Sequence, residues 1–135
     1  MRVAAAAYPL DPLADWRSFR AKLARWVADA AGQGADILVF PEYAAMELAH
    51  LAGPEAAGTV ETAIAAVSDR LEEADAVHAE LAAAHGVHML AGSAPVLSEG
   101  RLVNRARFFA PDGTVAAQDK LIPTRYERET MGLAA

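Results

Sequence analysis

The segment ILVFPEY, residues 37–43, passes from four apolar residues to a proline and then to a glutamate. A short, continuous apolar run predicts a strand at residues 36–40 that is covered on both faces. Pro41 stiffens the exit from this strand and holds Glu42 near a fixed place. Sites in α/β sheets form beyond the carboxyl ends of the strands. Glu42 is therefore a candidate general base. Its aromatic neighbours, Phe40 and Tyr43, would shield the carboxylate partly from water, which favours that role. The alternative is a solvated loop carboxylate.

The residues before this segment predict a strand and then a helix. A strand is expected at residues 2–8, followed by a loop with two prolines. Asp15 is a suitable N-cap for the next helix, and the glycines at positions 32 and 34 are suitable to end it. Apolar residues at helical spacing mark its buried face: Trp16, Phe19, Leu23, Trp26, Val27 and Ala30.

The residues after the segment continue the alternation. Residues 43–58 are irregular, with a short helical turn expected at 44–51. A long amphipathic helix follows between Thr59, a suitable N-cap, and Gly86. Three strands are then expected, at residues 87–92, 102–110 and 115–120. The PDGT sequence between the last two predicts a tight hairpin turn.

The element order β-α-β-α-β-β-β favours an α/β fold. The closing hairpin makes its sheet mixed, with helices on one face. The last residues, ETMGLAA, predict neither a strand nor a helix. The sheet should therefore have an open edge and an uncovered face, through which the chain is expected to associate.

Composition excludes several classes of function. The 135 residues suit one domain, and a net charge of −6 argues against nucleic acids and anionic membranes as partners. The chain has no cysteine, so disulfides, thiolate metal sites and a cysteine nucleophile within it are excluded. The apolar N-terminus is interrupted by proline and is too short for a membrane span. A cytoplasmic location is the expectation.

A second stretch, QDKLIPTRYERE at residues 118–129, places a lysine at a strand end. An ammonium group near a developing oxyanion stabilises the transition state, and we expect Lys120 within about 6 Å of the Glu42 carboxylate. The alternative is a solvated lysine. Glu127 and Glu129 follow, and they read most simply as a solvated charge cluster with the neighbouring arginines.

Other polar residues are weaker candidates. Two serines have no obvious base: Ser93 and Ser98. A zinc site would need three converging ligands, and amphipathic positions at helix and strand ends explain the histidines better: His78, His85 and His88. Three arginines on the fourth strand suggest an exposed face or local ion pairs, with substrate carboxylate binding as the alternative: Arg101, Arg105 and Arg107.

In combination, these motifs resemble the nitrilase superfamily of carbon–nitrogen hydrolases. ILVFPEY is similar to that family's strand with its catalytic glutamate. NRARFFAPDGTVAAQDKLIPTRYERE is similar to its hairpin with the catalytic lysine and the residues that follow. The resemblance spans nearly the whole chain, whereas the chain spans about the first half of the family's fold. It implies one apparently truncated domain, residues 1–135, forming about half of an α-β-β-α sandwich.

The resemblance also implies an activity. Glu42 would be the base, Lys120 the oxyanion stabiliser, and Glu127, in preference to Glu129, the second glutamate. The substrate would be a small amide or nitrile, with no metal or organic cofactor. The family's cysteine nucleophile lies further along than this chain extends, so the chain alone should be inactive. A homo-oligomer or a complementary C-terminal half would be the partner.

Two other readings remain open at this point. A non-catalytic domain could use its uncovered sheet face as an oligomerising or partner-binding scaffold. An unrelated flavodoxin-like domain would need phosphate-binding loops, which residues 8–14 and 92–100 do not supply. The short chain itself would fit a frameshifted gene, a split gene with a partner subunit, or a shortened protein.

Overall fold

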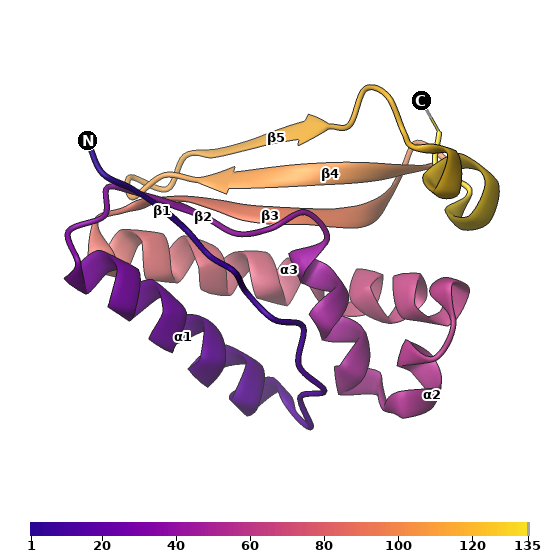
Figure 1. Cartoon of the computed structure of the whole chain (residues 1–135), viewed down its shortest axis with the longest axis horizontal. Helices are drawn as coiled ribbons and strands as arrows, with labels where there is room; N and C mark the ends of the chain where they lie inside the picture. The colour runs from indigo at the N-terminus through magenta and orange to yellow at the C-terminus, as the bar shows by residue number, and fades with distance from the viewer. Residues whose placement is uncertain (135) are drawn as a thin grey trace.

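A computed structural model describes residues 1–134. One five-stranded sheet has the spatial order β1-β2-β3-β4-β5 (Figure 1). The first three strands are mutually parallel, and the last two continue the sheet antiparallel. The sheet is therefore mixed, as the sequence predicts. Its strands are β1 (Val3–Ala5), β2 (Ile37–Val39), β3 (His88–Ser98), β4 (Arg101–Phe109) and β5 (Val115–Asp119).

Two long helices, α1 (Trp16–Gly32) and α3 (Val60–His85), cover one face of this sheet (Figure 1). The predicted caps form in both. Asp15 accepts a hydrogen bond from the Ser18 amide at 2.7 Å, and Thr59 accepts one from the amide of Thr62. Each cap satisfies an amide that the first helical turn leaves unpaired.

The hydrophobic core lies between the helices and the sheet. Leu38 and Met89 point from the sheet into it, against helix residues Val27 and Val67, and all four are at most 2% exposed. Burying each such side chain stabilises the fold by roughly 1.5–3 kcal/mol. This packing fixes the strand ends from which the candidate site is built.

A buried ion pair joins α1 to η1 (Ala44–Ala52), a 3₁₀ helix shortly after β2. Glu47 is fully buried and bonded to the ammonium of Lys22, which is 3% exposed. The Tyr8 hydroxyl donates to the second oxygen of Glu47 at 2.7 Å. Buried charges of this kind are retained only when they are paired and hydrogen-bonded. The cluster thus anchors the segment that follows Glu42.

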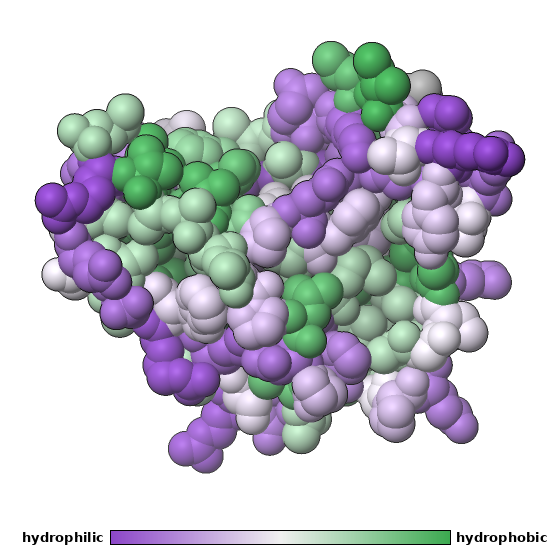
Figure 2. Space-filling model, in the orientation of Figure 1, coloured by the Kyte–Doolittle hydropathy of each residue, from purple (hydrophilic) through white to green (hydrophobic). Residues whose placement is uncertain are grey.

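The other face of the sheet has no helix over it (Figure 1). Strand residues alternate between faces, so the side chains next to core-facing Met89 and Phe109 point away from the helices. We call this surface the open face, and its central residues are apolar: Leu90, Ala106, Phe108 and Ala116. Figure 2 shows hydrophobic residues at the surface near the N-terminus of the chain. Val3, in β1, is 56% exposed.

Two strand lengths differ from the prediction. β1 is shorter than residues 2–8, because it pairs only with β2, which itself has three residues before Pro41. β3 is longer than residues 87–92 and continues to Ser98 through a bulge between Leu90 and Ser93. Pro95 fits within β3 because β2 has ended there, so its missing N–H faces no partner strand.

Two short elements differ from the prediction, and one agrees with it. η1 is the short helical turn expected at residues 44–51, whereas α2 (Pro54–Ala57) lies in a stretch expected to be irregular. η2 (Glu127–Met131), a π-helical turn, occupies the end of the chain where no helix was expected. The Ala134 amide donates to the Leu102 carbonyl at 2.8 Å, which ties this end to β4. None of the helices in residues 1–134 is long and apolar enough to cross a membrane.

Candidate active site

Glu42 and Lys120 meet at one end of the open face. Glu42 comes just after β2, and Lys120 directly follows β5, with two strands, β3 and β4, between β2 and β5 in the sheet. The Lys120 Nζ lies 2.9 Å from Oε1 of Glu42. The two residues named from separate motifs are therefore in direct contact, within the expected distance.

The turn that carries Glu42 is held by the bulge of β3. Tyr43 has a φ of 59°, which is unusual for a residue other than glycine. Its amide donates to the hydroxyl of Ser93 at 2.9 Å. Gly92 packs directly against the turn, since a Cβ there would lie 2.1 Å from the carbonyl oxygen of Pro41. Only glycine allows the two backbones to approach so closely.

Glu127 completes the cluster and is 3% exposed. Its carboxylate accepts hydrogen bonds from the Tyr43 hydroxyl at 2.5 Å and the Thr124 amide at 2.6 Å. The Lys120 Nζ lies 3.0 Å from its Oε2. Burial alone would raise the pKa of Glu127, but these donors outweigh it and bring the pKa to about 2. Glu127 is therefore a fixed negative charge.

Lys120 lies between two carboxylates, and its side chain is 29% exposed. Hydrogen bonds to Glu42 and then to Glu127 raise its pKa above the ordinary lysine value. The group is accordingly an ammonium ion at neutral pH. Such a group can stabilise a developing negative charge but cannot serve as a neutral base.

Asn104 is a member of the cluster that sequence reasoning missed as a site residue. It lies on β4 with 3% exposure, and its Nδ2 is 2.9 Å from Glu42 and 3.2 Å from Glu127. In the sequence it only introduces the hairpin motif. The available signal was a polar residue in line with the apolar open-face positions of β4, where a buried amide needs partners.

A groove of about 300 Å³ adjoins the cluster on the open face. Its lining includes both members of the Glu42–Lys120 pair, together with Leu90, Ser93, Asn104 and Ala106. The groove is mostly apolar with charged groups at one end, which is the usual character of a small-molecule site.

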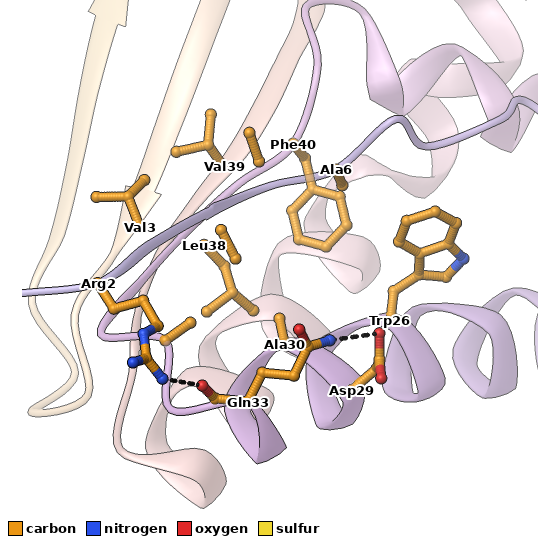
Figure 3. Close-up of a pocket in the computed structure, with 13 residues that line it drawn as sticks. Arg2, Val3, Ala6, Trp26, Asp29, Ala30, Gln33, Leu38, Val39 and Phe40 are labelled. Atoms are coloured by element: carbon orange, nitrogen blue, oxygen red, sulfur yellow. Dashed lines mark hydrogen bonds between the residues drawn. The ribbon is translucent and has the colours of Figure 1, made fainter.

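A second cavity of about 440 Å³ lies between β1, β2 and α1 (Figure 3). In that view Trp26 and Phe40 line one end, and Arg2 bonds to the carbonyl of Gln33 at the other. The cavity lies on the helix-covered side of the sheet, and its two charged lining residues, Arg2 and Asp29, are each hydrogen-bonded to Gln33. We therefore place the candidate site at the groove.

Comparison with known proteins decides the family. The profile of the carbon-nitrogen hydrolase family matches residues 2–133. This chain belongs to the carbon-nitrogen hydrolase family. Among curated proteins it is similar to Probable hydrolase YhcX of Bacillus subtilis (strain 168), with 26% identity over 135 residues. That match covers 100% of this chain and 26% of the relative.

Solved structures show the same carbon-nitrogen hydrolase fold. XC1258 from Xanthomonas campestris, a CN-hydrolase superfamily protein, matches with a TM-score of 0.61 at 23% identity, over 99% of this chain and 43% of its own. The carbon-nitrogen hydrolase from Helicobacter pylori G27 matches with a TM-score of 0.61 at 18% identity, over 98% of this chain and 42% of its own. A mutant of the nitrilase-superfamily amidase of Nesterenkonia AN1 matches with a TM-score of 0.57 at 22% identity, over 92% of this chain and 44% of its own. The chain thus spans less than half of each.

In this carbon-nitrogen hydrolase chain, the surroundings of Glu42 and Glu129 differ from those of the buried Glu127. The apolar shielding expected for Glu42 is absent: its side chain is 56% exposed, and the Phe40 ring turns into the core, 5.3 Å from that of Tyr8. Glu129 pairs with Arg125 at 2.9 Å on the surface. The structure thus brings Glu127, and not Glu129, to the lysine.

The remaining candidate residues make contacts that support the fold. Ser93 supports the turn after Glu42. His78 is buried with its ring 5.7 Å from that of Phe109, and residues 1–134 contain no group of three metal-ligating side chains. Two arginines form local ion pairs, Arg105 with Asp119 at 2.6 Å and Arg107 with Asp75 at 2.8 Å.

Proposed function

We propose that this chain provides the base and the oxyanion-stabilising cation of a nitrilase-type carbon–nitrogen hydrolase that acts on small amides or nitriles. The observation that carries the proposal is the position of Lys120 Nζ, within 3.0 Å of both the Glu42 and the Glu127 carboxylate. A cation beside an exposed carboxylate, at the end of an apolar groove, suits nucleophilic acyl transfer.

The nucleophile must come from outside these 135 residues, because the chain contains no cysteine. One matched structure of the Nesterenkonia sp. AN1 amidase shows acrylamide added at that enzyme's active site cysteine, which supports a thiol here too. Glu42 would take the thiol proton, and the thiolate would attack the amide or nitrile carbon. From an amide, ammonia or an amine would leave with the proton that Glu42 has taken. From a nitrile, the thioimidate formed would first add a water, and ammonia would then leave. A further water would hydrolyse the resulting thioester to release the acid.

Lys120 would act on the charge that develops during this attack. Its ammonium can donate to the oxyanion while keeping a bond to Glu127, because an ammonium has three protons. Glu127 would hold the lysine in place and keep it charged, since its own low pKa leaves it ionised at neutral pH. Removing one such oxyanion donor typically slows catalysis by about 10²–10³-fold.

The partner in this proposal covers the open face. Large apolar surfaces usually mark association sites, and the central residues of this face are Leu90, Ala106, Phe108 and Ala116. A complementary segment that carries the thiol, or a second copy of the chain, would shield them. The same surface supports the alternative proposal of a non-catalytic scaffold, which predicts association without thiol activation.

An introduced thiol distinguishes the two proposals. Because the chain has no cysteine of its own, Ala106→Cys gives a single thiol in the groove, and Ser68→Cys gives a matched thiol on the exposed face of α3. A nearby ammonium and base should promote thiolate formation. The enzyme proposal predicts that acrylamide alkylates the Ala106→Cys protein at least about tenfold faster than the control.

Adding Glu42→Gln should remove that excess rate, because the proton acceptor is lost. Equal rates for Ala106→Cys and Ser68→Cys, or an excess that survives Glu42→Gln, would contradict the base role of Glu42. Mass spectrometry of the intact chain measures the alkylated fraction directly.

A further inference from the structure

The two carboxylate oxygens of Glu42 have different surroundings. Oε1 accepts hydrogen bonds from both Lys120 Nζ and Asn104 Nδ2, each at 2.9 Å. Within residues 1–134, no donor reaches Oε2. The side chain is 56% exposed at the end of the groove. One oxygen is thus held by two donors, and the other is free to accept a proton.

Asn104 is the donor whose orientation is fixed. Its amide has two protons on Nδ2, and the two acceptors are Glu42 Oε1 at 2.9 Å and Glu127 Oε1 at 3.2 Å. Exchanging the amide oxygen and nitrogen would turn an oxygen toward two carboxylates, which is repulsive. The arrangement therefore has one stable orientation.

This arrangement has a cost that a purely structural role does not explain. Asn104 is 3% exposed, and its Oδ1 is buried without a hydrogen-bond partner in the described part of the chain. An unpaired buried acceptor destabilises a fold. An apolar residue of similar size at this position would avoid that cost. What Asn104 adds in return is the link between the two carboxylates.

We propose that Asn104 is a positioning residue that, together with Lys120, occupies Oε1 of Glu42 and leaves Oε2 as the atom that takes the proton. The proposal rests on the base role of Glu42 stated above. Two donors on one oxygen draw electron density toward it, while the lone pairs of the other remain available. Because Asn104 also bonds Glu127, it sets the orientation of the Glu42 carboxylate relative to the lysine.

Side-chain NMR tests the hydrogen-bond pattern without any need for activity. In a ¹⁵N-labelled chain, the Asn104 amide gives two proton resonances, and both should lie downfield because each proton faces a carboxylate. Glu42→Gln should move one of them upfield and leave the other, and Glu127→Gln should do the reverse. The proposal is overturned if both substitutions move the same proton, or if neither moves one.

Asn104→Leu then tests positioning against plain structural support. We expect it to shift the carboxylate ¹³C resonance of Glu42 while the backbone amides of α1 keep their positions. In the Ala106→Cys background it should slow alkylation of the introduced thiol. An unchanged Glu42 resonance in a folded Asn104→Leu protein would overturn the proposal.

The two proposals fail in different ways. If the Ala106→Cys thiol shows no dependence on Glu42, the base role fails, while the amide spectrum still reports whether Asn104 joins the two carboxylates. If Asn104→Leu does not fold, the two glutamine variants decide the inference, because they keep Asn104 itself.

Discussion

The hydroxyl of Tyr43, the residue next to Glu42, donates a hydrogen bond to Glu127, which lies 84 positions further along the chain. The bond joins the turn after β2 to the segment after β5. Tyr43 thereby shares the Oε1 acceptor of Glu127 with Asn104. The position of the candidate base thus depends on residues from both ends of the sequence.

Tyr43→Phe should lower the free energy of unfolding by about 1.5–3 kcal/mol, the usual contribution of a hydrogen bond to a charged group. Urea denaturation measures this change. Tyr126→Phe is the matched control, because Tyr126 is 56% exposed and should change stability by less than about 0.5 kcal/mol. Equal effects of the two substitutions would show that the Tyr43–Glu127 bond contributes nothing.

Glu127 should make the fold sensitive to acid. Its pKa is about 2 in the folded chain and 4.5 ordinarily, so the unfolded chain binds a proton first as the pH falls. The stabilisation is complete above pH 4.5 and is lost between pH 4.5 and 2, by up to about 3 kcal/mol. Glu127→Gln should flatten this part of the stability curve. A curve that keeps its slope in the variant would contradict the assignment.

His78 should act in a higher pH window. Burial, and then the charge of Arg107, lower its pKa from 6.5 to about 4, so protonation favours the unfolded chain. Its contribution is present above pH 6.5 and is lost as the pH falls to 4, again by up to about 3 kcal/mol. Thermal unfolding of His78→Phe should lack this decline. His85→Gln is the matched control for loss of a histidine from the same helix.

Gly92→Ala should strongly destabilise the turn that carries Glu42. The new Cβ would lie 2.1 Å from the Pro41 carbonyl oxygen, at a φ of 78°. Gly100 has a similar φ of 75° but open space around it, so Gly100→Ala measures the backbone strain alone, about 1 kcal/mol. Gly92→Ala should cost several kcal/mol more. Similar costs at the two positions would mean that the contact with Pro41 is not tight.

Sequence reasoning predicted the sheet and the meeting of Glu42 with Lys120 for a physical reason. Apolar periodicity and turn residues determine where strands end, and both residues follow strand ends. The choice of Glu127 over Glu129 came from the family resemblance, since the two look alike in a charged stretch. Their different burial depends on η2, which the sequence after Lys120 does not predict.

Contacts between distant elements could not be predicted in this way. Asn104 joins two carboxylates only because of the register of β4 against β5 and the path of the turn after β2. The buried Lys22–Glu47 pair looks in the sequence like two helix-surface charges. The left-handed backbone at Tyr43 has no sequence signal either, because tyrosine rarely adopts it.

The most direct measurement of the central claim is ammonia release from butyramide by this chain assembled with a cysteine-bearing segment of the amidase from Nesterenkonia sp. AN1. A cysteine-to-alanine mutant of that amidase has been solved in complex with butyramide. Glu42→Gln should lower the rate by about 10²-fold or more. Glu129→Gln removes a charge from an exposed ion pair and should leave the rate unchanged. Equal rates for the two variants would contradict the account.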